Sequence, residues 1–527
     1  MSPPGAAGPP SGGTAPTALL LAAASGLAIG ATFSPHGGPV VPFLAFAPLA
    51  ASLSLTARDV SAPPLAPFAQ GFTAAAVAHG IGLYWMVPSL SWRTPLAVPT
   101  YLLVVLLIGV VAGAACGAAT FLHGRKGWPL ALALAACWTG FEWLAARVPW
   151  VPYAWLNAGS SLAWHPALAA GAEVFGARFL TFWTVAAGAC LAAFPAPWRS
   201  WSRRPRGWSP VRRAEPRTIA LVSLLLTLPA LGGQVRQADL DSLRNADVLA
   251  EVAVVQPGRA GGDLDRWLDP LREQAGIRPY VAAVFPERFL GVPGPDLARS
   301  AGVLRTDILI GALDAEPLAD SPDTLWYNAA FVQPAAGPAP PPYRKARLVP
   351  GLEATGVWPA AGRPLPNRGY AAGRDPRPLM LGGHPTGVMI CYDSAFEATA
   401  RTLVRAGAEW LAVISNDDWL DPGRPFRTTW AYWQHATHGR LRAIENRVSV
   451  IQVGATGYSF AVSPAGRGAP HALEPGVEGV AVLTAAPRHG TTLFTRTGDL
   501  LGVVCFAVFM AGAIGGAMPN VMSRLRL

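Results

Sequence analysis

Charged residues are scarce in this chain of 527 residues. They make up 14% of it, against 51% apolar residues, which excludes an ordinary pair of soluble domains. Cysteine is also rare, and four of the five cysteines lie inside long apolar segments. This pattern excludes a disulfide framework and leaves Cys391 as a free thiol. Residues 1–16 contain no Lys or Arg, so the basic region of a cleaved signal peptide is absent and we expect a short disordered tail before a retained membrane anchor.

Long apolar stretches dominate the first half of the chain. Eight stretches approach or exceed the roughly 17 to 25 residues that a helix needs to cross a bilayer, and their Ala and Gly content suits helices packed closely in lipid. We expect a seven-helix membrane domain over 17–232 and a final helix with a cytoplasmic tail over 499–527. Burial in a soluble protein is an alternative for single stretches, mainly 39–55 and 218–232, but does not account for seven in succession. The expected spans are 17–33, 39–55, 68–89, 96–122, 128–146, 167–195, 218–232 and 500–518.

The placement of basic residues predicts the orientation of these spans. Short loops rich in Lys and Arg stay on the cytoplasmic side, and seven arginines cluster between the sixth and seventh spans. Arg58, Arg125 and Lys126 fall on the same side, so segment 233–498 is expected outside the cytoplasm. The net charge of +10 therefore reflects topology, and we expect no nucleic-acid partner. The seven clustered residues are Arg199, Arg203, Arg204, Arg206, Arg212, Arg213 and Arg217, and Arg524 and Arg526 at the C-terminus agree with them.

The segment 233–498 has the character of an α/β domain. Short buried strands alternate with amphipathic helices from Asp247 onward, which predicts layers of sheet and helix. The loop from Gln333 to Tyr343 contains five prolines and is either a lid or a tolerated insertion. The expected strands are 250–256, 280–285, 307–313, 326–332, 385–391, 410–415, 448–455 and 459–463, and the expected helices are 264–275, 394–406 and 430–446.

Cys391 stands where one of these strands ends. A cysteine attacks as a thiolate, and the positive end of a helix beginning near Ser394 would stabilise the thiolate or the oxyanion it creates. A lone cysteine at a strand end is more often a small buried apolar residue. Cys391 therefore indicates a nucleophile only in combination with other groups.

Two other groups precede Cys391 in the outer segment. Glu287 directly follows an apolar strand and is a candidate general base, with a surface ion pair to Arg288 as the alternative. Lys345 lies in a basic patch beside Arg344, with a solvated face as the alternative. The order of acid, amine and thiol indicates nucleophilic chemistry, although none of the three residues would do so alone.

Histidines offer two rival arrangements. His384 could form a dyad with Cys391, but it lies seven residues before Cys391 on or near the same strand, which places it too far away. His435 and His438 lie three apart on an expected helix and could bind a metal, but suitable further ligands do not follow. We therefore expect no metal and interpret these histidines as packing or polar contacts.

Motifs spread along the chain resemble a known family. Glu287, Lys345 and Cys391, with their surroundings, resemble the triad of the nitrilase, or carbon-nitrogen hydrolase, superfamily, whose members form an αββα sandwich. Combined with the apolar spans, the whole chain resembles the apolipoprotein N-acyltransferase family. The further motifs are Glu142-Trp143, Val148-Pro149-Trp150, Val254-Val255-Gln256, Lys345 to Pro350, Ser415-Asn416-Asp417-Asp418-Trp419, Trp433-Gln434-His435 with Arg440, Arg442-Ala443 and Glu445, and Thr492 to Asp499.

The resemblance implies a role for each site residue. Glu287 would be the general base, Lys345 would stabilise the oxyanion, Cys391 would be the nucleophile and Glu353 a supporting acid. The supporting set would also include Tyr392, the aromatic residue after the cysteine, Asp393, where the family usually has Glu, and Trp267, one position out of step with a functional tryptophan. Gly351-Leu352 likewise replaces the usual Phe-Gly before Glu353.

The resemblance also implies a reaction. An acyl chain would pass from a phospholipid to Cys391 as a thioester, and then to the N-terminal α-amine of a diacylated apolipoprotein, without any cofactor. The enzyme would lie in a bacterial cytoplasmic membrane with its catalytic domain on the periplasmic side, and we expect a monomer. Alternatives are a membrane-tethered amidase that uses water, a conjugation-associated relative with another acceptor, and a non-catalytic binding protein. The substitution at Asp393 leaves room for a different acceptor.

Overall fold

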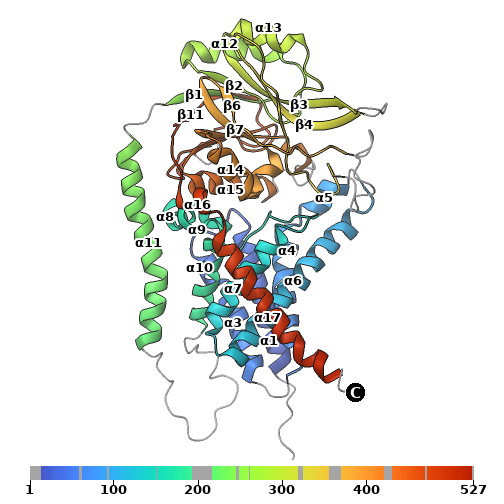
Figure 1. Cartoon of the computed structure of the whole chain (residues 1–527), viewed down its shortest axis with the longest axis vertical. Coiled ribbons are helices and arrows are strands. Elements are labelled where there is room, and N and C mark those ends of the chain that lie inside the picture. The colour runs from blue at the N-terminus through green and yellow to red at the C-terminus, as the bar shows by residue number, and fades with distance from the viewer. Residues whose placement is uncertain are drawn as a thin grey trace, which may run out of the picture.

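The computed structural model describes most of the chain as a helical part joined to an α/β part (Figure 1). The basic residues 199–213, most of the N-terminal tail and Arg526 lie outside the described residues. The described residues are 14–58, 62–91, 94–149, 151–192, 216–244, 249–259, 261–318, 324–354, 369–420, 430–468 and 472–524.

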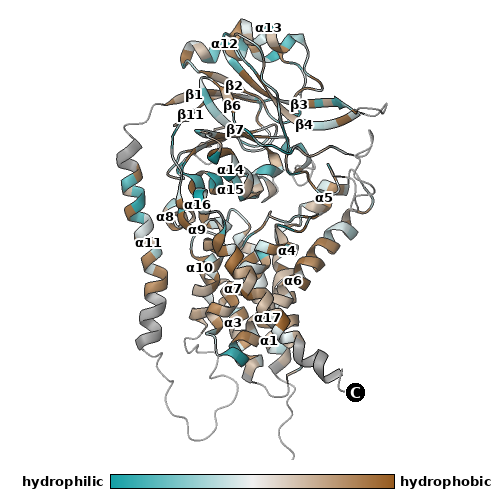
Figure 2. Ribbon diagram, viewed as in Figure 1, coloured by the Kyte–Doolittle hydropathy of each residue, from teal (hydrophilic) through white to brown (hydrophobic). Residues whose placement is uncertain are grey.

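The helical part is built mainly from the apolar segments, and Figure 2 shows apolar residues concentrated along its bundled helices. Helices α1, α4, α6, α7 and α17 pack together through small and apolar side chains. The elements are α1 (Thr14–Thr32), α2 (Val41–Leu44), α3 (Ala47–Arg58), α4 (Ala66–Gly82), α5 (Met86–Ser91), α6 (Ala97–Lys126), α7 (Leu130–Ala145), η1 (Ser160–Trp164), α8 (Pro166–Ala169), α9 (Ala172–Phe175), α10 (Arg178–Leu191), α11 (Pro216–Arg244) and α17 (Leu500–Arg524).

Fewer of these helices have the length and hydropathy of a membrane span than the sequence predicts. Among the described residues three do, at Ala15–Thr32, Ala97–Lys126 and Leu500–Ala517, and a fourth is added if one bent pair counts as a span. Val41–Ala57 and Leu130–Ala145 form shorter apolar helices. The apolar helices agree with a membrane protein, whereas the number of eight spans is not established by them.

The sixth expected span, 167–195, is not one straight helix. The segment Pro166–Phe175 meets α10 at an angle of 118°, and the break lies at Gly176, whose φ of +78° favours glycine. A Cβ atom there would come within 2.6 Å of the Phe494 ring. The seventh apolar segment also differs, because α11 continues to Arg244 and the expected domain boundary at residue 233 falls inside it.

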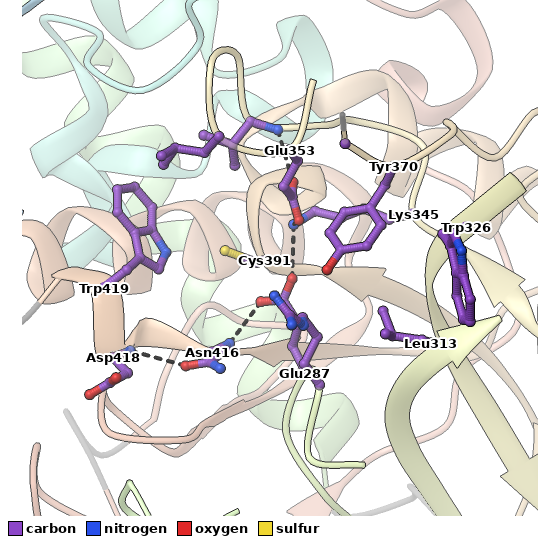
Figure 3. Close-up of a pocket in the computed structure, with 14 residues that line it drawn as sticks. Glu287, Leu313, Trp326, Lys345, Glu353, Tyr370, Cys391, Asn416, Asp418 and Trp419 are labelled. Carbon is purple, nitrogen blue, oxygen red and sulfur yellow. Dashed lines mark hydrogen bonds and ion pairs between the residues drawn. The ribbon is translucent and has the colours of Figure 1, made fainter. Parts of the chain in front are cut away.

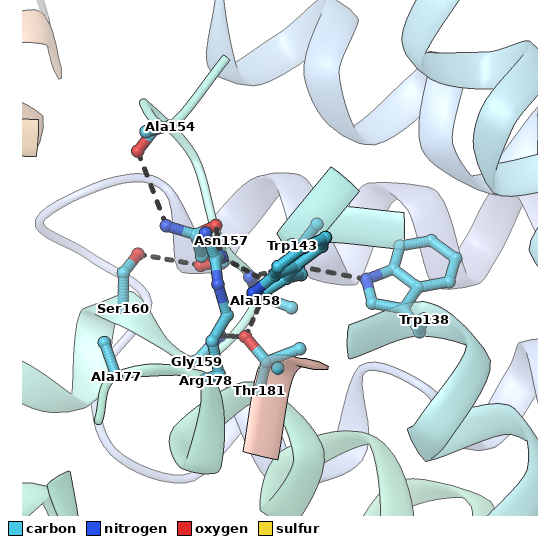
Figure 4. Close-up of polar contacts among 12 residues, drawn as sticks. Trp138, Trp143, Ala154, Asn157, Ala158, Gly159, Ser160, Ala177, Arg178 and Thr181 are labelled. Carbon is cyan, nitrogen blue, oxygen red and sulfur yellow. Dashed lines mark hydrogen bonds and ion pairs between the residues drawn. The ribbon is translucent and has the colours of Figure 1, made fainter. Parts of the chain in front are cut away.

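Buried charges tie the helical part together near the α/β part. Glu142 on α7 accepts hydrogen bonds from Trp138 Nε1 at 3.2 Å, Ala158 N at 2.8 Å and Thr181 Oγ1 at 2.7 Å. Its other partner is Arg178, at 3.4 Å (Figure 4). A carboxylate in an apolar helix requires such partners, and these contacts fix the loop at Ala158 against α10.

The α/β part contains two sheets with the strand orders β11-β1-β2-β3-β4-β5 and β10-β9-β8-β7-β6. Strands β1, β2 and β3 are mutually parallel, as are β7, β8 and β9, while the outer strands pair antiparallel. The strands are β1 (Ala250–Gln256), β2 (Ala282–Val284), β3 (Asp307–Pro317), β4 (Thr324–Gln333), β5 (Tyr343–Arg344), β6 (Leu379–Leu381), β7 (His384–Ile390), β8 (Trp410–Ser415), β9 (Ser449–Gly454), β10 (Phe460–Val462) and β11 (Gly479–Ala485).

The two sheets pack face to face between two helical layers. Residues such as Val254 and Ile390 form the apolar interior between the sheets. Helices α12 and α13 cover the first sheet, and α14 and α15 cover the second on the side that faces the helical part (Figure 1). This order agrees with the expected αββα sandwich. The covering elements are η3 (Asp265–Trp267), α12 (Leu268–Ile277), α13 (Pro295–Leu304), η4 (Cys391–Ala395), α14 (Glu397–Arg405), η5 (Asp417–Leu420), α15 (Trp430–Asn446) and α16 (Leu493–Thr497).

Candidate active site

A cavity of about 520 Å³ opens where the carboxyl ends of parallel strands from both sheets meet. Glu287 follows β2, Cys391 follows β7 and Asn416 follows β8, and such strand ends are the usual position of ligand sites in α/β domains. The cavity volume is in the range of small-molecule sites. Figure 3 shows the Cys391 sulfur and the side chains of Glu287 and Lys345 directed toward the same space. The lining residues are Glu287, Arg288, Leu313, Trp326, Lys345, Val349, Leu352, Glu353, Gly369, Tyr370, Cys391, Asn416, Asp418 and Trp419.

The backbone at Cys391 turns sharply as β7 ends. Cys391 has a φ of +49°, a left-handed conformation that a side chain adopts at a cost of about 1 to 3 kcal/mol unless its surroundings stabilise it. The carbonyl oxygen of Cys391 accepts a hydrogen bond from Ser394 Oγ at 2.7 Å. The turn starts η4, and the helix expected from Ser394 begins only at Glu397. Cys391 is thereby lifted out of the strand and exposes its sulfur to the cavity.

Lys345 lies between two carboxylates. Its Nζ atom is 2.9 Å from Glu287 Oε1 and 2.9 Å from Glu353 Oε1, and its side chain is 1% exposed. Asn328 on β4 donates to the same two oxygens, at 2.6 Å and 2.9 Å. Glu287 Oε2 also accepts from Asn416 N at 2.8 Å. The structure therefore brings together the acid, amine and thiol, which are spread over more than a hundred positions of the sequence.

This arrangement sets the charges of the cluster. Burial alone would lower the pKa of Lys345, but the carboxylates of Glu287 and Glu353 outweigh it and hold the pKa well above its usual value. Burial would raise the pKa of Glu353, and the Lys345 ammonium more than offsets this and lowers it. Burial, followed by the charge of Glu287, raises the pKa of the Cys391 thiol well above its usual value. The resting site therefore holds an ammonium, ionised Glu353 and a neutral thiol.

Two of the expected supporting residues lie behind Cys391 and do not line the cavity. The carboxylate of Asp393 accepts from Ile390 N at 3.0 Å and Arg347 N at 2.7 Å. Burial raises the pKa of Asp393 to about 6. Tyr392 points toward the helical part and donates to the Pro152 carbonyl at 2.7 Å. Both side chains contact the turn or its neighbours and not the cavity.

Trp267 and His384 lie apart from the cavity. Trp267 is 4% exposed and packs among apolar residues between the first sheet and α12. His384 stands at the start of β7, where its Nδ1 atom is 2.8 Å from Glu409 Oε2. The structure does not bring either side chain to Cys391.

Three buried side chains form a grouping that could hold a metal ion. The ligand atoms of Cys391, Asp417 and His435 lie within 4.8 Å of one another. Hydrogen bonds already engage two of them, because His435 Nδ1 is 3.0 Å from Asp417 Oδ1 and its Nε2 is 3.3 Å from the Cys391 carbonyl oxygen. Burial alone would lower the pKa of His435, but Asp417 and this carbonyl outweigh it and raise the pKa. Asp417 and His435 therefore form a hydrogen-bonded network with the backbone of Cys391.

Sequence reasoning missed several residues of the site. Asn328 bridges the two carboxylates, and Trp326 and Tyr370 line the cavity. The available signal for Asn328 was a polar residue inside an otherwise apolar strand. Trp326 and Tyr370 carry no comparable signal, because only folding places them around Lys345.

Comparisons with known proteins agree with both parts of the chain. Residues 25–190 match the family described as apolipoprotein N-acyltransferase N-terminal domain, and residues 285–487 match carbon-nitrogen hydrolase. An apolipoprotein N-acyltransferase of Bradyrhizobium diazoefficiens is 28% identical over 84% of this chain and 86% of its own. An apolipoprotein N-acyltransferase of Bordetella bronchiseptica is 26% identical over 94% of this chain and 97% of its own length.

Some solved structures are similar to the α/β part of this chain, at lower sequence identity. A carbon-nitrogen hydrolase from Helicobacter pylori G27 aligns over 45% of this chain and 89% of its own, at 17% identity and a TM-score of 0.34. The fold, the cavity and the family matches define the class as a carbon-nitrogen hydrolase domain carried on an apolar helical domain. The combination of both domains, matched by relatives along most of the chain, places this protein in the apolipoprotein N-acyltransferase family.

Proposed function

We propose that this protein transfers an acyl chain from a phospholipid to the N-terminal α-amine of a diacylglyceryl-cysteine apolipoprotein. The observation that carries the proposal is the cluster of Glu287, Lys345, Glu353 and Cys391 in one cavity next to an apolar helical domain. The relatives named apolipoprotein N-acyltransferase along most of the chain support the choice of donor and acceptor.

In the first step, Cys391 attacks the ester carbonyl carbon of the phospholipid. Glu287 takes the thiol proton as the carbon-sulfur bond forms, because the neutral thiol of the resting site is not itself nucleophilic. The Lys345 ammonium stabilises the oxyanion of the tetrahedral intermediate. The ester carbon-oxygen bond then breaks, Glu287 returns the proton to the departing oxygen, and a lysophospholipid leaves a thioester on Cys391.

In the second step, the α-amine of the apolipoprotein attacks the thioester carbon. Glu287 accepts the amine proton, Lys345 again stabilises the oxyanion, and the carbon-sulfur bond breaks. The sulfur recovers a proton from Glu287, which leaves an amide and a free thiol. All groups in this scheme come from the protein, and no cofactor enters it.

The supporting residues hold the reacting groups in place. Glu353 fixes the Lys345 ammonium from the side opposite Glu287, and Asp393 joins the nucleophile turn to the backbone at Arg347. Tyr392 anchors the turn to the helical part. Trp267 stabilises the outer helical layer through its packing among apolar residues of the first sheet and α12.

The membrane arrangement is part of the proposal. Residues 17–232 would supply seven spans and residues 499–527 the last span with its cytoplasmic tail, and the α/β domain between them, 233–498, would face the periplasm of a bacterial inner membrane. The apolar helices α1, α6 and α17 and the arginine-rich segment before α11 support this topology. The donor lipid would then reach the cavity from the bilayer, and one copy of the chain would suffice.

Mass spectrometry of the purified protein tests the reaction. Incubation with a phospholipid carrying a labelled acyl chain should give an acyl adduct on the peptide containing Cys391, and later addition of a diacylated lipopeptide should discharge it as a triacylated product. Cys391→Ser should form no thioester. An active preparation without an adduct on Cys391 would refute the mechanism, and loss of the adduct to water alone would refute the acceptor.

A further inference from the structure

The side of α15 that faces the helical part carries Gln434, whose amide is fully engaged there. Its Oε1 atom accepts from Trp85 Nε1 at 3.0 Å and Trp155 Nε1 at 2.8 Å, and its Nε2 donates to the Phe33 carbonyl at 3.0 Å and the Gly82 carbonyl at 2.9 Å. A glutamine amide has two donors and one oxygen with two lone pairs. Every hydrogen-bonding position of this buried side chain is therefore used by the helical part.

The next residue of α15 faces the nucleophile. His435 reaches Asp417 with one ring nitrogen and the Cys391 carbonyl oxygen with the other. Both partners are oxygens that accept hydrogen bonds, so full engagement requires a hydrogen on each nitrogen and a positively charged ring. Two adjacent residues of one helix thus contact the helical part and the backbone of Cys391.

Trp155 connects these contacts to Tyr392, the residue that follows Cys391. Its indole donates to Gln434, stacks on the His435 ring with centroids 5.7 Å apart, and stacks on Tyr392 at 6.1 Å. Tyr392 also donates to the Pro152 carbonyl. The carbonyl of the strained Cys391 and the side chain of the next residue, Tyr392, are therefore both contacted by groups that lie against the helical part.

We propose that Gln434 is a positioning residue that fixes α15 to the helical part so that His435 holds the Cys391 backbone in its reactive conformation. The helical domain would then set the reactivity of the nucleophile in addition to anchoring it in the membrane. The inference relies on the proposed function for the assignment of Cys391 as nucleophile.

A second hydrogen bond on α15 provides a matched control. Trp164 Nε1 on η1 donates to Thr437 Oγ1 at 2.8 Å, and the Thr437 side chain is buried like that of Gln434. This bond joins the same helix to the helical part, but through partners other than those that reach the nucleophile. Thr437→Val keeps the shape of the side chain and removes this bond together with the one that Thr437 donates to the Trp433 carbonyl within α15. Gln434→Met keeps a similar length and removes four hydrogen bonds to the helical part.

The test uses the full-length protein in lipid nanodiscs and measures two rates by peptide mass spectrometry. These are alkylation of Cys391 by iodoacetamide and formation of its acyl adduct from a labelled phospholipid. Gln434→Met should lower both rates by about tenfold to a hundredfold, the effect expected for a misplaced reacting group. Thr437→Val should stay within about twofold of the wild type, since it leaves that geometry intact. Equal rates in the two variants, or losses that only follow a common fall in the unfolding temperature, would overturn the proposal.

A second variant covers the case in which Gln434→Met does not fold. Gln434→Glu keeps an acceptor for the two tryptophans but loses both donors, and its carboxylate would face the carbonyls of Phe33 and Gly82. Its alkylation rate relative to the wild type should be low at neutral pH and recover when acid protonates the carboxyl group, which then donates again. A pH-independent ratio would overturn the proposal. A wild type that alkylates normally but forms no acyl adduct would refute the proposed function, while the alkylation comparison would still decide the role of Gln434.

Discussion

The Tyr343 hydroxyl donates a hydrogen bond to Asp393 Oδ2 at 2.8 Å. This bond spans the two sheets, because Tyr343 belongs to β5, directly before Lys345, and Asp393 belongs to the turn that presents Cys391. The same carboxylate also receives the backbone N–H groups of Ile390 and Arg347. Asp393 therefore holds the segment that carries Lys345 and the turn at Cys391 in a fixed relative position.

Removal of this carboxylate should separate the two segments. Asp393→Ala leaves buried donors without partners, which costs about 1 to 3 kcal/mol, and should lower kcat by about tenfold to a hundredfold through misplacement of Lys345 against Cys391. Tyr343→Phe removes one donor only and should cost about 1 kcal/mol. The measurements are thioester formation and thermal unfolding. Asp375→Asn, at an exposed ion pair with Arg377, is the control and should stay within about 0.5 kcal/mol.

Much of the α/β domain could be predicted from the sequence because its central elements are long and regular. The expected strands 250–256 and 410–415 and the expected helix 430–446 coincide with β1, β8 and α15. Apolar runs bounded by polar residues define such elements regardless of their neighbours. The short strands β5 and β6 were missed, because two or three residues carry no periodicity, and the helix α13 and the strand β11 were missed as well.

Only those site residues could be predicted whose chemical role is recognisable from residue type and place in the sequence. Glu287 and Cys391 each follow an expected strand and Lys345 lies between them in the sequence, so the order of the three residues was visible. The position of Asn328 was not, because it depends on the pairing of β3 with β4, which sets Leu313 opposite Asn328, and on the bond from Lys345 N to the Asn328 carbonyl at 2.8 Å. The packing of the Phe494 ring against Gly176 likewise joins residues that are far apart in the sequence.

The two lysines of this chain should differ sharply toward an amine-acylating reagent. Lys126 is exposed at the end of α6, whereas Lys345 is buried between two carboxylates that hold its pKa well above its usual value. Each unit by which the pKa rises lowers the reactive, unprotonated fraction about tenfold. At about pH 8, peptide mass spectrometry should find Lys126 modified and Lys345 protected, and both modified once the protein is denatured. Equal labelling in the native protein would contradict the buried ammonium.

Glu353→Gln should show how much the ion pair of Glu353 with Lys345 contributes to stability at each pH. The folded-state pKa of Glu353 lies below its ordinary value, so its ionic stabilisation is complete above the ordinary value of about 4.3 and is lost as the pH falls through the folded-state pKa. The free energy of unfolding of the wild type should exceed that of Glu353→Gln by about 1.5 to 3 kcal/mol near neutral pH. This difference should vanish in acid. Thermal unfolding of both proteins from neutral to acid pH measures this difference in stability. A difference that grows as the pH falls would have the wrong sign for this pair.

Gly311→Ala should displace Glu287, the proposed general base, without changing any chemical group of the site. Gly311 lies on β3 behind the turn that carries Glu287, and a Cβ atom there would lie 2.5 Å from Glu287 Cα, 2.6 Å from Arg288 N and 2.6 Å from the Pro286 carbonyl oxygen. These are backbone atoms, so the turn itself must move, at a cost of about 1 to 3 kcal/mol for overpacking.

The shifted turn would pull Glu287 away from Lys345 and from the amide of Asn416, and kcat should fall about tenfold or more. The binding of phospholipid should change less, because the cavity keeps its remaining walls. Gly302→Ala is the matched control, since a Cβ atom on α13 meets nothing within 4 Å and alanine stabilises a helix by about 0.5 to 1 kcal/mol relative to glycine. If kcat in Gly311→Ala equalled that in Gly302→Ala, the position of Glu287 against β3 would not control the reaction.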